Sequence, residues 1–180
     1  MNENGIFQLG SFKVKPGERV SGFLSLGDGE FQLPVTILNG EEPGKTVLIT
    51  AGIHAEEYVG IQAAVELADR LKTEKIAGTV VIVKVINREA FEKRSGSFGY
   101  EDGKNLNRVF PGNPKGTQME RLAWGIEKEL FPVADYYIDL HSGDSYEQLA
   151  PYVYYAGQAS EETVKVSREM AQQVDVPYMV

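Results

Sequence analysis

The feature that most constrains the fold of this chain is an alternation of short apolar runs with an amphipathic helical pattern. Thr46–Thr50 and Gly78–Ile86 are nearly continuous apolar runs, as expected of strands covered on both faces. Between them, Tyr58–Leu71 places apolar side chains at helical spacing, which predicts an amphipathic helix. A strand–helix–strand unit of this kind forms a right-handed crossover between parallel strands. The sequence therefore predicts an α/β fold, with a mainly parallel (mixed) sheet and helices on both faces.

An N-terminal β-hairpin is predicted ahead of this unit. Two apolar runs, Val20–Leu26 and Phe31–Leu38, flank a Gly-Asp-Gly sequence that is typical of a hairpin turn. Glu41–Gly44 has no strand or helix pattern and is interpreted as a turn. We expect residues 1–40 to be an N-terminal β segment and residues 41–180 an α/β catalytic core, together forming one domain over residues 1–180.

The second half of the chain continues the alternation after a long loop. Residues 87–115 show no periodic pattern and are expected to be a loop of a length that usually indicates a binding loop or lid. A helix is expected after Thr117, which forms a capping box with Glu120. The remaining expected elements are a strand at Tyr136–Leu140, a strand at Tyr152–Tyr155, a helix from Glu161 to about Val174 capped by Ser160, and a strand beginning at Pro177.

The composition excludes several classes of partner and site. The 180-residue chain has no cysteine, which rules out disulfides and thiolate metal sites, and nothing in it indicates a place outside the cytoplasm. Its formal net charge of −8 at pH 7 argues against nucleic acid or an anionic membrane surface as the main partner. No apolar run approaches the length of a membrane span, and residues 1–10 lack the pattern of a signal peptide. We expect a cytoplasmic protein without nucleic-acid or membrane partners.

The chain contains two histidines, and both follow predicted strands directly. His54 comes after the strand at residues 46–50, and His141 comes after the strand at residues 136–140. Ligands of open parallel sheets bind beyond the carboxyl ends of the strands. Glu57 lies three residues after His54, on the same face of a helical turn. An H-x-x-E spacing is weak evidence by itself, and a strand-end histidine is often structural. The joint placement nevertheless favours a catalytic zinc site with an open fourth position.

Two arginines and an asparagine are candidates for binding a carboxylate. Arg88 follows the strand at residues 78–86, at the same edge of the sheet. Arg108 lies in the long loop next to Asn107, in a segment that Leu106 and Phe110 would anchor. A guanidinium can hold a carboxylate through two hydrogen bonds, which a lysine cannot. A surface ion pair is the alternative for each arginine.

Two further carboxylates lie close to the predicted ligands. Successive residues of a helix are rotated by about 100° around its axis. The side chain of Glu56, which is adjacent to Glu57, would therefore point away from the metal. We interpret it as a surface carboxylate, or as one that hydrogen-bonds to a metal ligand without binding the metal itself. Asp139 projects from the same strand face as His141. It could orient the ring of that histidine or hydrogen-bond to nearby backbone, and the sequence leaves both open.

Four motifs, in the order GIHAEEYVG, INREAF, DGKNLNRVFPG and DLHSG, together resemble the succinylglutamate desuccinylase/aspartoacylase family. This family is related to the zinc carboxypeptidases, and the resemblance runs from about Val20 to the end of the chain. It implies a zinc-carboxypeptidase-like fold with Zn²⁺ as the cofactor. The zinc ligands that it implies are His54, Glu57 and His141.

The same resemblance implies a function. It indicates a zinc-dependent deacylase that cleaves the amide bond of an N-acyl amino acid or a similar small carboxylate-bearing substrate. Arg88 matches the catalytic, carbonyl-polarising position, and Asn107 with Arg108 matches the substrate-binding positions. The alternatives are a metallocarboxypeptidase acting on peptides or cell-wall fragments, and a non-catalytic zinc-binding fragment.

The general acid/base is the piece that the resemblance does not supply. In the family this glutamate lies well downstream of the third ligand, in a stretch that would follow Val180. We therefore expect the core to be truncated at its C-terminal end, and the chain to bind zinc but hydrolyse amides poorly. The acyl group, the amino acid and homo-oligomer formation stay open at this stage.

Overall fold

The computed structural model describes residues 5–180. Its contacts group the chain into two compact units, Met1–Tyr146 and Glu147–Val180, which are described separately below. The single domain over residues 1–180 therefore stays a prediction. No helix in the described range is long and apolar enough to cross a membrane.

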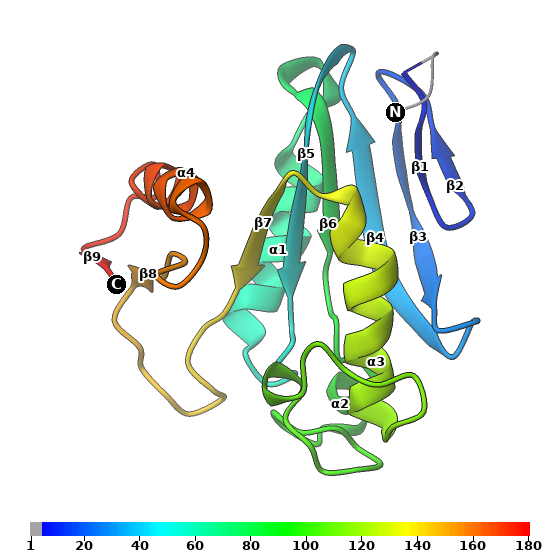
Figure 1. Cartoon of the computed structure of the whole chain (residues 1–180), viewed down its shortest axis with the longest axis vertical. Coiled ribbons are helices and arrows are strands. Elements are labelled where there is room, and N and C mark those ends of the chain that lie inside the picture. Colours follow the sequence, from blue (N-terminus) through cyan, green and yellow to red (C-terminus); the bar gives the residue numbers. More distant parts are fainter. Residues whose placement is uncertain (1–4) are drawn as a thin grey trace. The chain divides into compact units, whose positions relative to one another are not determined.

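The first unit is built on a five-stranded sheet with the strand order β3-β4-β6-β5-β7 (Figure 1). β5 (Glu42–Ala51) lies between β6 (Ala77–Val83) and β7 (Tyr136–Leu140) and pairs in parallel with both. β3 (Arg19–Leu26) and β4 (Phe31–Asn39) are antiparallel, and β4 joins the hairpin to β6. The α/β class and the mixed sheet are confirmed, with two parallel and two antiparallel strand pairs.

The N-terminal hairpin is also confirmed, and it forms part of the main sheet. The turn between β3 and β4 uses positive φ angles at Gly27 (59°) and Gly29 (94°), which glycine adopts at little steric cost. A second, smaller hairpin precedes it, formed by β1 (Phe7–Leu9) and β2 (Phe12–Val14). The sequence did not predict this hairpin, because strands of three residues are too short to show an alternating pattern.

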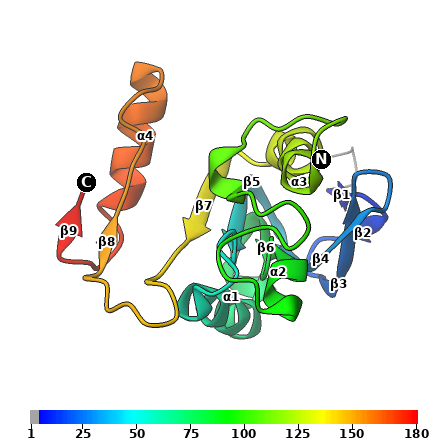
Figure 2. The ribbon, with the colours of Figure 1, turned by 90° about the horizontal axis from the view of Figure 1, so that it is seen from below.

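Helices cover both faces of the sheet, as predicted. α1 (Tyr58–Arg70) packs on one face and α3 (Gln118–Gly125) on the other (Figure 2). Successive residues of a strand point to opposite faces. Leu48 of β5 accordingly joins the core beneath α3, and Ile49 joins the core beneath α1. These two apolar layers cover β5 on both faces, between β6 and β7.

The interpretation of Glu41–Gly44 as a simple turn was wrong. β5 begins at Glu42, and its pairing with β6 shifts register between Glu42 and Thr46. Gly44 permits this irregular start, because a Cβ there would lie 2.7 Å from backbone atoms of Ala77. The Pro-Gly sequence thus marks a bulged strand start rather than a break between strands.

The long loop at residues 87–115 contains more structure than expected. It includes α2 (Arg88–Lys93), a 3-10 turn at Leu106–Arg108, and an isolated antiparallel bridge between Phe98 and Asn105. Each element is too short to produce a periodic sequence pattern. The capping box before α3 is confirmed, since the Glu120 carboxylate accepts a hydrogen bond from the backbone nitrogen of Thr117 at 2.8 Å.

The second unit contains one helix and a small parallel ladder. α4 (Glu161–Ala171) begins after Ser160, whose hydroxyl oxygen accepts from the backbone nitrogen of Thr163 at 3.2 Å. β8 (Tyr152–Val153) pairs in parallel with β9 (Tyr178–Met179). The predicted helix cap is confirmed, and both predicted strands occur in shorter form and in a sheet of their own.

Candidate metal centre

The three predicted ligands converge at the carboxyl edge of the sheet. His54 follows β5, His141 directly follows β7, and Glu57 is the residue before α1. Because β5 and β7 are parallel neighbours, their carboxyl ends lie side by side. The potential ligand atoms of the three side chains all lie within 4.8 Å of one another. The joint placement inferred from the sequence therefore produces a real cluster.

The carboxylate of Glu57 lies between the two imidazoles. Its Oε1 is 2.7 Å from Nδ1 of His54, and its Oε2 is 2.7 Å from Nδ1 of His141. The backbone nitrogen of Ser142 donates to the same Oε2 at 3.2 Å. Both rings thus direct the same kind of nitrogen, Nδ1, toward one point.

A glycine in α1 makes this approach of helix and strand geometrically feasible. A Cβ at Gly60 would lie only 2.9 Å from the backbone oxygen of Leu140. Its absence lets the first turn of α1 lie against the end of β7. Glu57, one turn earlier, therefore reaches His141 although 84 positions separate the two in the chain.

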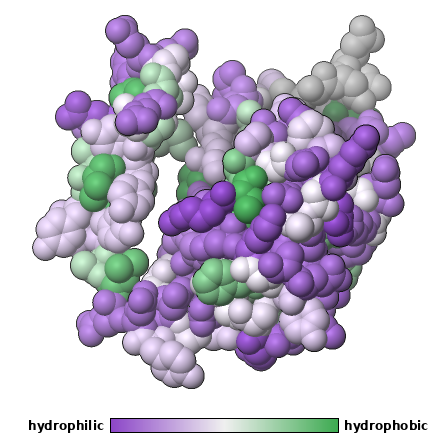
Figure 3. All heavy atoms as spheres, turned by 60° about the horizontal axis from the view of Figure 1, so that its bottom comes forward, coloured by the Kyte–Doolittle hydropathy of each residue, from purple (hydrophilic) through white to green (hydrophobic). Residues whose placement is uncertain are grey.

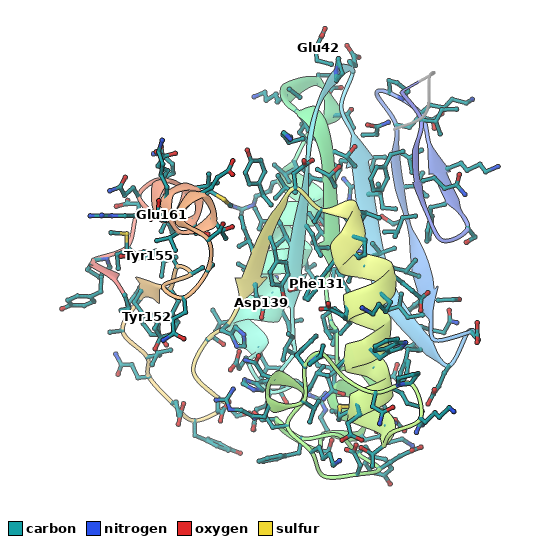
Figure 4. The ribbon with its side chains drawn as sticks, viewed as in Figure 1. Glu42, Phe131, Asp139, Tyr152, Tyr155 and Glu161 are labelled. Carbon is teal, nitrogen blue, oxygen red and sulfur yellow. The ribbon has the colours of Figure 1, made fainter. Side chains whose placement is uncertain are left out.

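The outer nitrogens of both rings are held by acceptors. Nε2 of His141 donates to Asp139 Oδ2 at 2.8 Å, and Nε2 of His54 donates to Asn105 Oδ1 at 3.2 Å. The backbone nitrogen of Asn107 also donates to that Asn105 atom at 2.8 Å, which identifies it as the carbonyl oxygen. Asp139 therefore contacts the ring of His141, as the first of its two predicted roles requires. Figure 4 shows Asp139 at the lower part of β7.

The hydrogen bonds within the cluster shift the pKa values of all three side chains. Burial raises the pKa of Glu57, but hydrogen bonds from His141 and His54 outweigh this and lower the pKa to about 2. Hydrogen bonds to Asp139 and Glu57 raise the pKa of His141 to about 10. The pKa of His54 is raised as well, chiefly by its hydrogen bond to Glu57. The carboxylate is thus ionised at neutral pH and available as a ligand.

The donor set fits a transition-metal ion. Two imidazole nitrogens and one carboxylate oxygen are the protein ligands of one common type of catalytic zinc site. Here each imidazole also donates its second N–H to an oxygen, which is the arrangement that orients histidine ligands in metalloproteins. The residues present therefore fit a bound metal, which the two Nδ1 atoms and Glu57 would hold.

Arg88 lies at the same edge of the sheet, and its guanidinium contacts other groups. Its Nε donates to Glu92 at 2.7 Å, and its Nη1 donates to the backbone oxygen of Gln32 at 3.3 Å. The guanidinium also lies 4.8 Å above the ring of Phe23. The structure thus does not bring Arg88 into contact with the metal ligands. Its catalytic role remains a prediction that requires a different rotamer.

Asn107 and Arg108 form the 3-10 turn that follows Asn105. Asn107 is half-buried, while Arg108 is exposed and donates to the backbone oxygen of Asn107 at 3.0 Å. Within residues 5–180, no carboxylate forms an ion pair with Arg108. Its guanidinium is therefore available to an external anion. Figure 3 brings this lower end of the unit forward and shows a mostly hydrophilic surface with small separate hydrophobic patches.

Glu56 points away from the metal ligands, as its helical position indicated. Its carboxylate accepts hydrogen bonds from the hydroxyls of Ser97 at 3.2 Å and Ser145 at 3.3 Å. It therefore ties the segment after α2 to the segment after His141. This carboxylate supports the loops around the site and contacts neither histidine in the hydrogen bonds of the described residues.

Some residues around the site were not singled out from the sequence. Asn105 contacts His54, and Thr50 donates to Asp139 at 2.6 Å. Arg94 donates to the hydroxyl of Tyr58, the residue after Glu57, at 3.3 Å. The Asn-x-Asn spacing of residues 105 and 107 was a usable signal for a local side-chain turn. The sequence carried no comparable signal for Thr50 or Arg94.

Comparison with known proteins agrees with this arrangement. A family model described as the succinylglutamate desuccinylase/aspartoacylase catalytic domain matches residues 43–180. The N-alpha-acetyl-L-2,4-diaminobutyric acid deacetylase of Halomonas elongata is 39% identical over 126 residues, which are 69% of this chain and 36% of that protein.

Solved structures show the same fold. A product-bound structure of the ectoine utilization protein EutE (DoeB) from Ruegeria pomeroyi has a TM-score of 0.81 and 29% identity, over 99% of this chain and 56% of that chain. A metallo-carboxypeptidase from Burkholderia cenocepacia has a TM-score of 0.58 and 16% identity, over 83% of this chain and 43% of that chain, so it is informative for the fold alone. The expected carboxypeptidase-like fold is confirmed. The chain spans 36% of the length of the curated relative, and 56% and 43% of the two solved chains.

Proposed function

Because the chain belongs to the succinylglutamate desuccinylase/aspartoacylase family, we propose that it forms the metal-binding part of a zinc-dependent, cytoplasmic deacylase. The substrate would be an N-acyl amino acid or a similar small molecule with a carboxylate. One observation carries this proposal: Nδ1 of His54 and Nδ1 of His141 both point at the buried carboxylate of Glu57. That geometry matches the donor set of a hydrolytic zinc centre.

The metal supplies Lewis-acid polarisation of the substrate carbonyl when it is bound. The chain's own residues bind and orient the substrate. Arg108, exposed and without a carboxylate partner in the described range, holds the substrate carboxylate through its guanidinium, and Asn107 adds an amide beside it. This fixes the scissile amide near the metal ligands, which is where orientation contributes most to the rate.

A peptide substrate receives no comparable support. The likeness to the metallo-carboxypeptidase is at 16% identity and concerns the fold. The curated relative from Halomonas elongata, 39% identical over 126 residues, is described instead as a deacetylase of an acetylated amino acid. We therefore place N-acyl amino acids first, and a panel of peptides serves as the comparison.

An activity assay with metal removal tests the proposed function. The natural protein that contains this sequence is incubated with N-acetyl and N-succinyl amino acids, including N-alpha-acetyl-L-2,4-diaminobutyric acid, and with short peptides. We expect release of the free amino acid from at least one N-acyl compound, loss of release after chelation, and recovery with zinc. Activity unchanged after complete metal removal, or cleavage confined to peptides, would contradict the proposal.

The role of Arg88 can be separated from that of its neighbour Arg94. If Arg88 moves onto the developing oxyanion, Arg88→Ala should lower kcat by about 10²–10³-fold and leave KM within a few-fold. Glu92→Gln, which removes the ion pair that now holds Arg88, should preserve kcat. Steady-state kinetics of both variants and of Arg94→Ala check this. A small effect of Arg88→Ala together with a large loss in Arg94→Ala would move the role to Arg94, whose guanidinium lies 5.8 Å from the Tyr58 ring.

A further inference from the structure

A chain of hydrogen bonds extends from His141 into the interior of the sheet. Thr50 on β5 and Asp139 on β7 are opposite each other in the parallel ladder. The Thr50 hydroxyl donates to Asp139 Oδ1 at 2.6 Å, and the other oxygen of Asp139 accepts from His141. The hydroxyl of Tyr137 lies 2.9 Å from Oγ1 of Thr50. Thr50 is 0% exposed, so these protein groups are the partners of its hydroxyl.

The direction of every hydrogen bond in this chain follows from the chemistry of the groups. A carboxylate only accepts, so the single hydroxyl proton of Thr50 is directed to Asp139. Tyr137 must then donate its own proton to Thr50. Asp139 accepts the proton on Nε2 of His141 in the same way. Loss of the Nδ1 proton, which here lies between His141 and Glu57, would leave a neutral imidazole with its proton on Nε2 and a lone pair on Nδ1 for a metal.

We infer that Thr50 is a positioning residue of the metal centre, which orients Asp139 and, through it, the ring of His141. Tyr137 completes the arrangement by saturating the Thr50 oxygen. Thr50 acts only through Asp139, because its hydroxyl bonds are to Asp139 and Tyr137. The inference rests on the proposed metal-dependent function and adds a residue that the four sequence motifs do not contain.

Packing restricts the side chain of Tyr137, at the end of the hydrogen-bond chain that is farthest from His141. The ring of Tyr137 lies 4.9 Å from that of Phe131, which stacks at 6.0 Å on Phe110. Phe131 belongs to the segment after α3, and Figure 4 shows it beside the sheet on which Asp139 lies. The Tyr137 hydroxyl is therefore held against Thr50 although the residue as a whole is 41% exposed. A tyrosine hydroxyl held at this end can donate to Thr50 while the Thr50 proton is directed to Asp139.

The first test compares zinc affinities. Thr50→Val keeps the shape of the side chain and removes the hydroxyl, while Thr50→Ser keeps the hydroxyl. We expect zinc to bind about tenfold more weakly to Thr50→Val, at the lower end of the effects known for residues that support metal ligands. Thr50→Ser should stay within about threefold of the unchanged protein on the same grounds. Competition with a chromogenic chelator measures both.

A matched control separates positioning from stability. Thr36 on β4 is also 0% exposed, and its hydroxyl is paired with that of Ser21 at 2.8 Å, away from the metal ligands. Thr36→Val loses a hydrogen bond that is partly buried, like those of Thr50, and should keep the original zinc affinity. If Thr36→Val weakens zinc binding as much as Thr50→Val, the effect is one of general stability and the inference is wrong.

A second readout does not depend on zinc or on activity. The chain has two histidines, so the side-chain N–H signals of a ¹⁵N-labelled sample can be assigned to the two rings. In metal-free protein we expect Thr50→Val to accelerate the exchange of the His141 Nε2 proton with water. The His54 proton, held by Asn105, should be unaffected. Unchanged exchange at His141 would overturn the inference even if zinc binds as proposed. Failure of the original protein to bind zinc would instead contradict the proposed function.

Discussion

Replacing either histidine by alanine is expected to weaken zinc binding by about 10²–10³-fold. Structural zinc sites with four protein ligands contribute roughly 10–16 kcal/mol, which is about 2.5–4 kcal/mol for each ligand. At about 1.4 kcal/mol for each factor of ten, the loss of one ligand gives this range. The chain has only His54 and His141, so no other imidazole can replace the missing one. Competition titrations of His54→Ala and His141→Ala measure the effect.

The adjacent glutamates supply a matched comparison for this prediction. Glu57 lies between the two Nδ1 atoms, whereas Glu56 is bound by Ser97 and Ser145. Glu57→Gln should therefore weaken zinc binding strongly, and Glu56→Gln should leave it nearly unchanged. Equal zinc affinity in both histidine variants and in the original protein would show that the metal, if any, is held elsewhere.

Removal of the Arg108 guanidinium is expected to raise KM for N-acyl amino acids by about 10²-fold, with a smaller effect on kcat. Charge-assisted hydrogen bonds contribute about 1.5–3 kcal/mol each, and the upper part of that range corresponds to a factor of about 100. When a contact is equally strong in the ground state and the transition state, its loss raises KM and leaves kcat nearly unchanged. Steady-state kinetics of Arg108→Ala in the natural protein measure this.

The carboxylate specificity of Arg108 can be tested with the substrate as well as with the protein. The methyl ester of the same N-acyl amino acid lacks the charge, so Arg108→Ala should change its KM little. Arg108→Lys should recover only part of the loss, because lysine cannot form the two parallel hydrogen bonds. Arg70, which pairs with Glu66 on α1 at 2.7 Å, provides a control in which alanine should have no effect. An equal loss for acid and ester would argue against carboxylate capture.

The sequence predicted the parts of the site that depend on local spacing. His54 and His141 each follow an apolar strand, and parallel strands place such residues at one edge. Glu57 follows His54 within one turn, so its reach was also a local property. The capping box at Thr117 and the hairpin before β5 were predictable for the same reason. In each case a few adjacent residues determine the geometry.

The parts that were missed depend on contacts between distant segments. Asn105 reaches His54 because the loop folds back at the bridge between Phe98 and Asn105, and no periodic pattern marks that bridge. Thr50 faces Asp139 only because β5 and β7 pair in one particular register. The rotamer of Arg88, directed to Glu92, reflects a competition between partners that residue types do not determine. Sequence spacing therefore predicted the cluster of His54, Glu57 and His141, and tertiary contacts determine the residues around it.

Anomalous diffraction at the zinc absorption edge, from crystals of the zinc-loaded protein, tests the central claim most directly. The expected result is one strong peak, roughly 2.0–2.2 Å from Nδ1 of His54, from Nδ1 of His141 and from a carboxylate oxygen of Glu57. The Nε2 atoms of the two rings should still contact Asn105 and Asp139. A peak bound by the Nε2 atoms or by other residues, or no peak between these three side chains, would contradict the account.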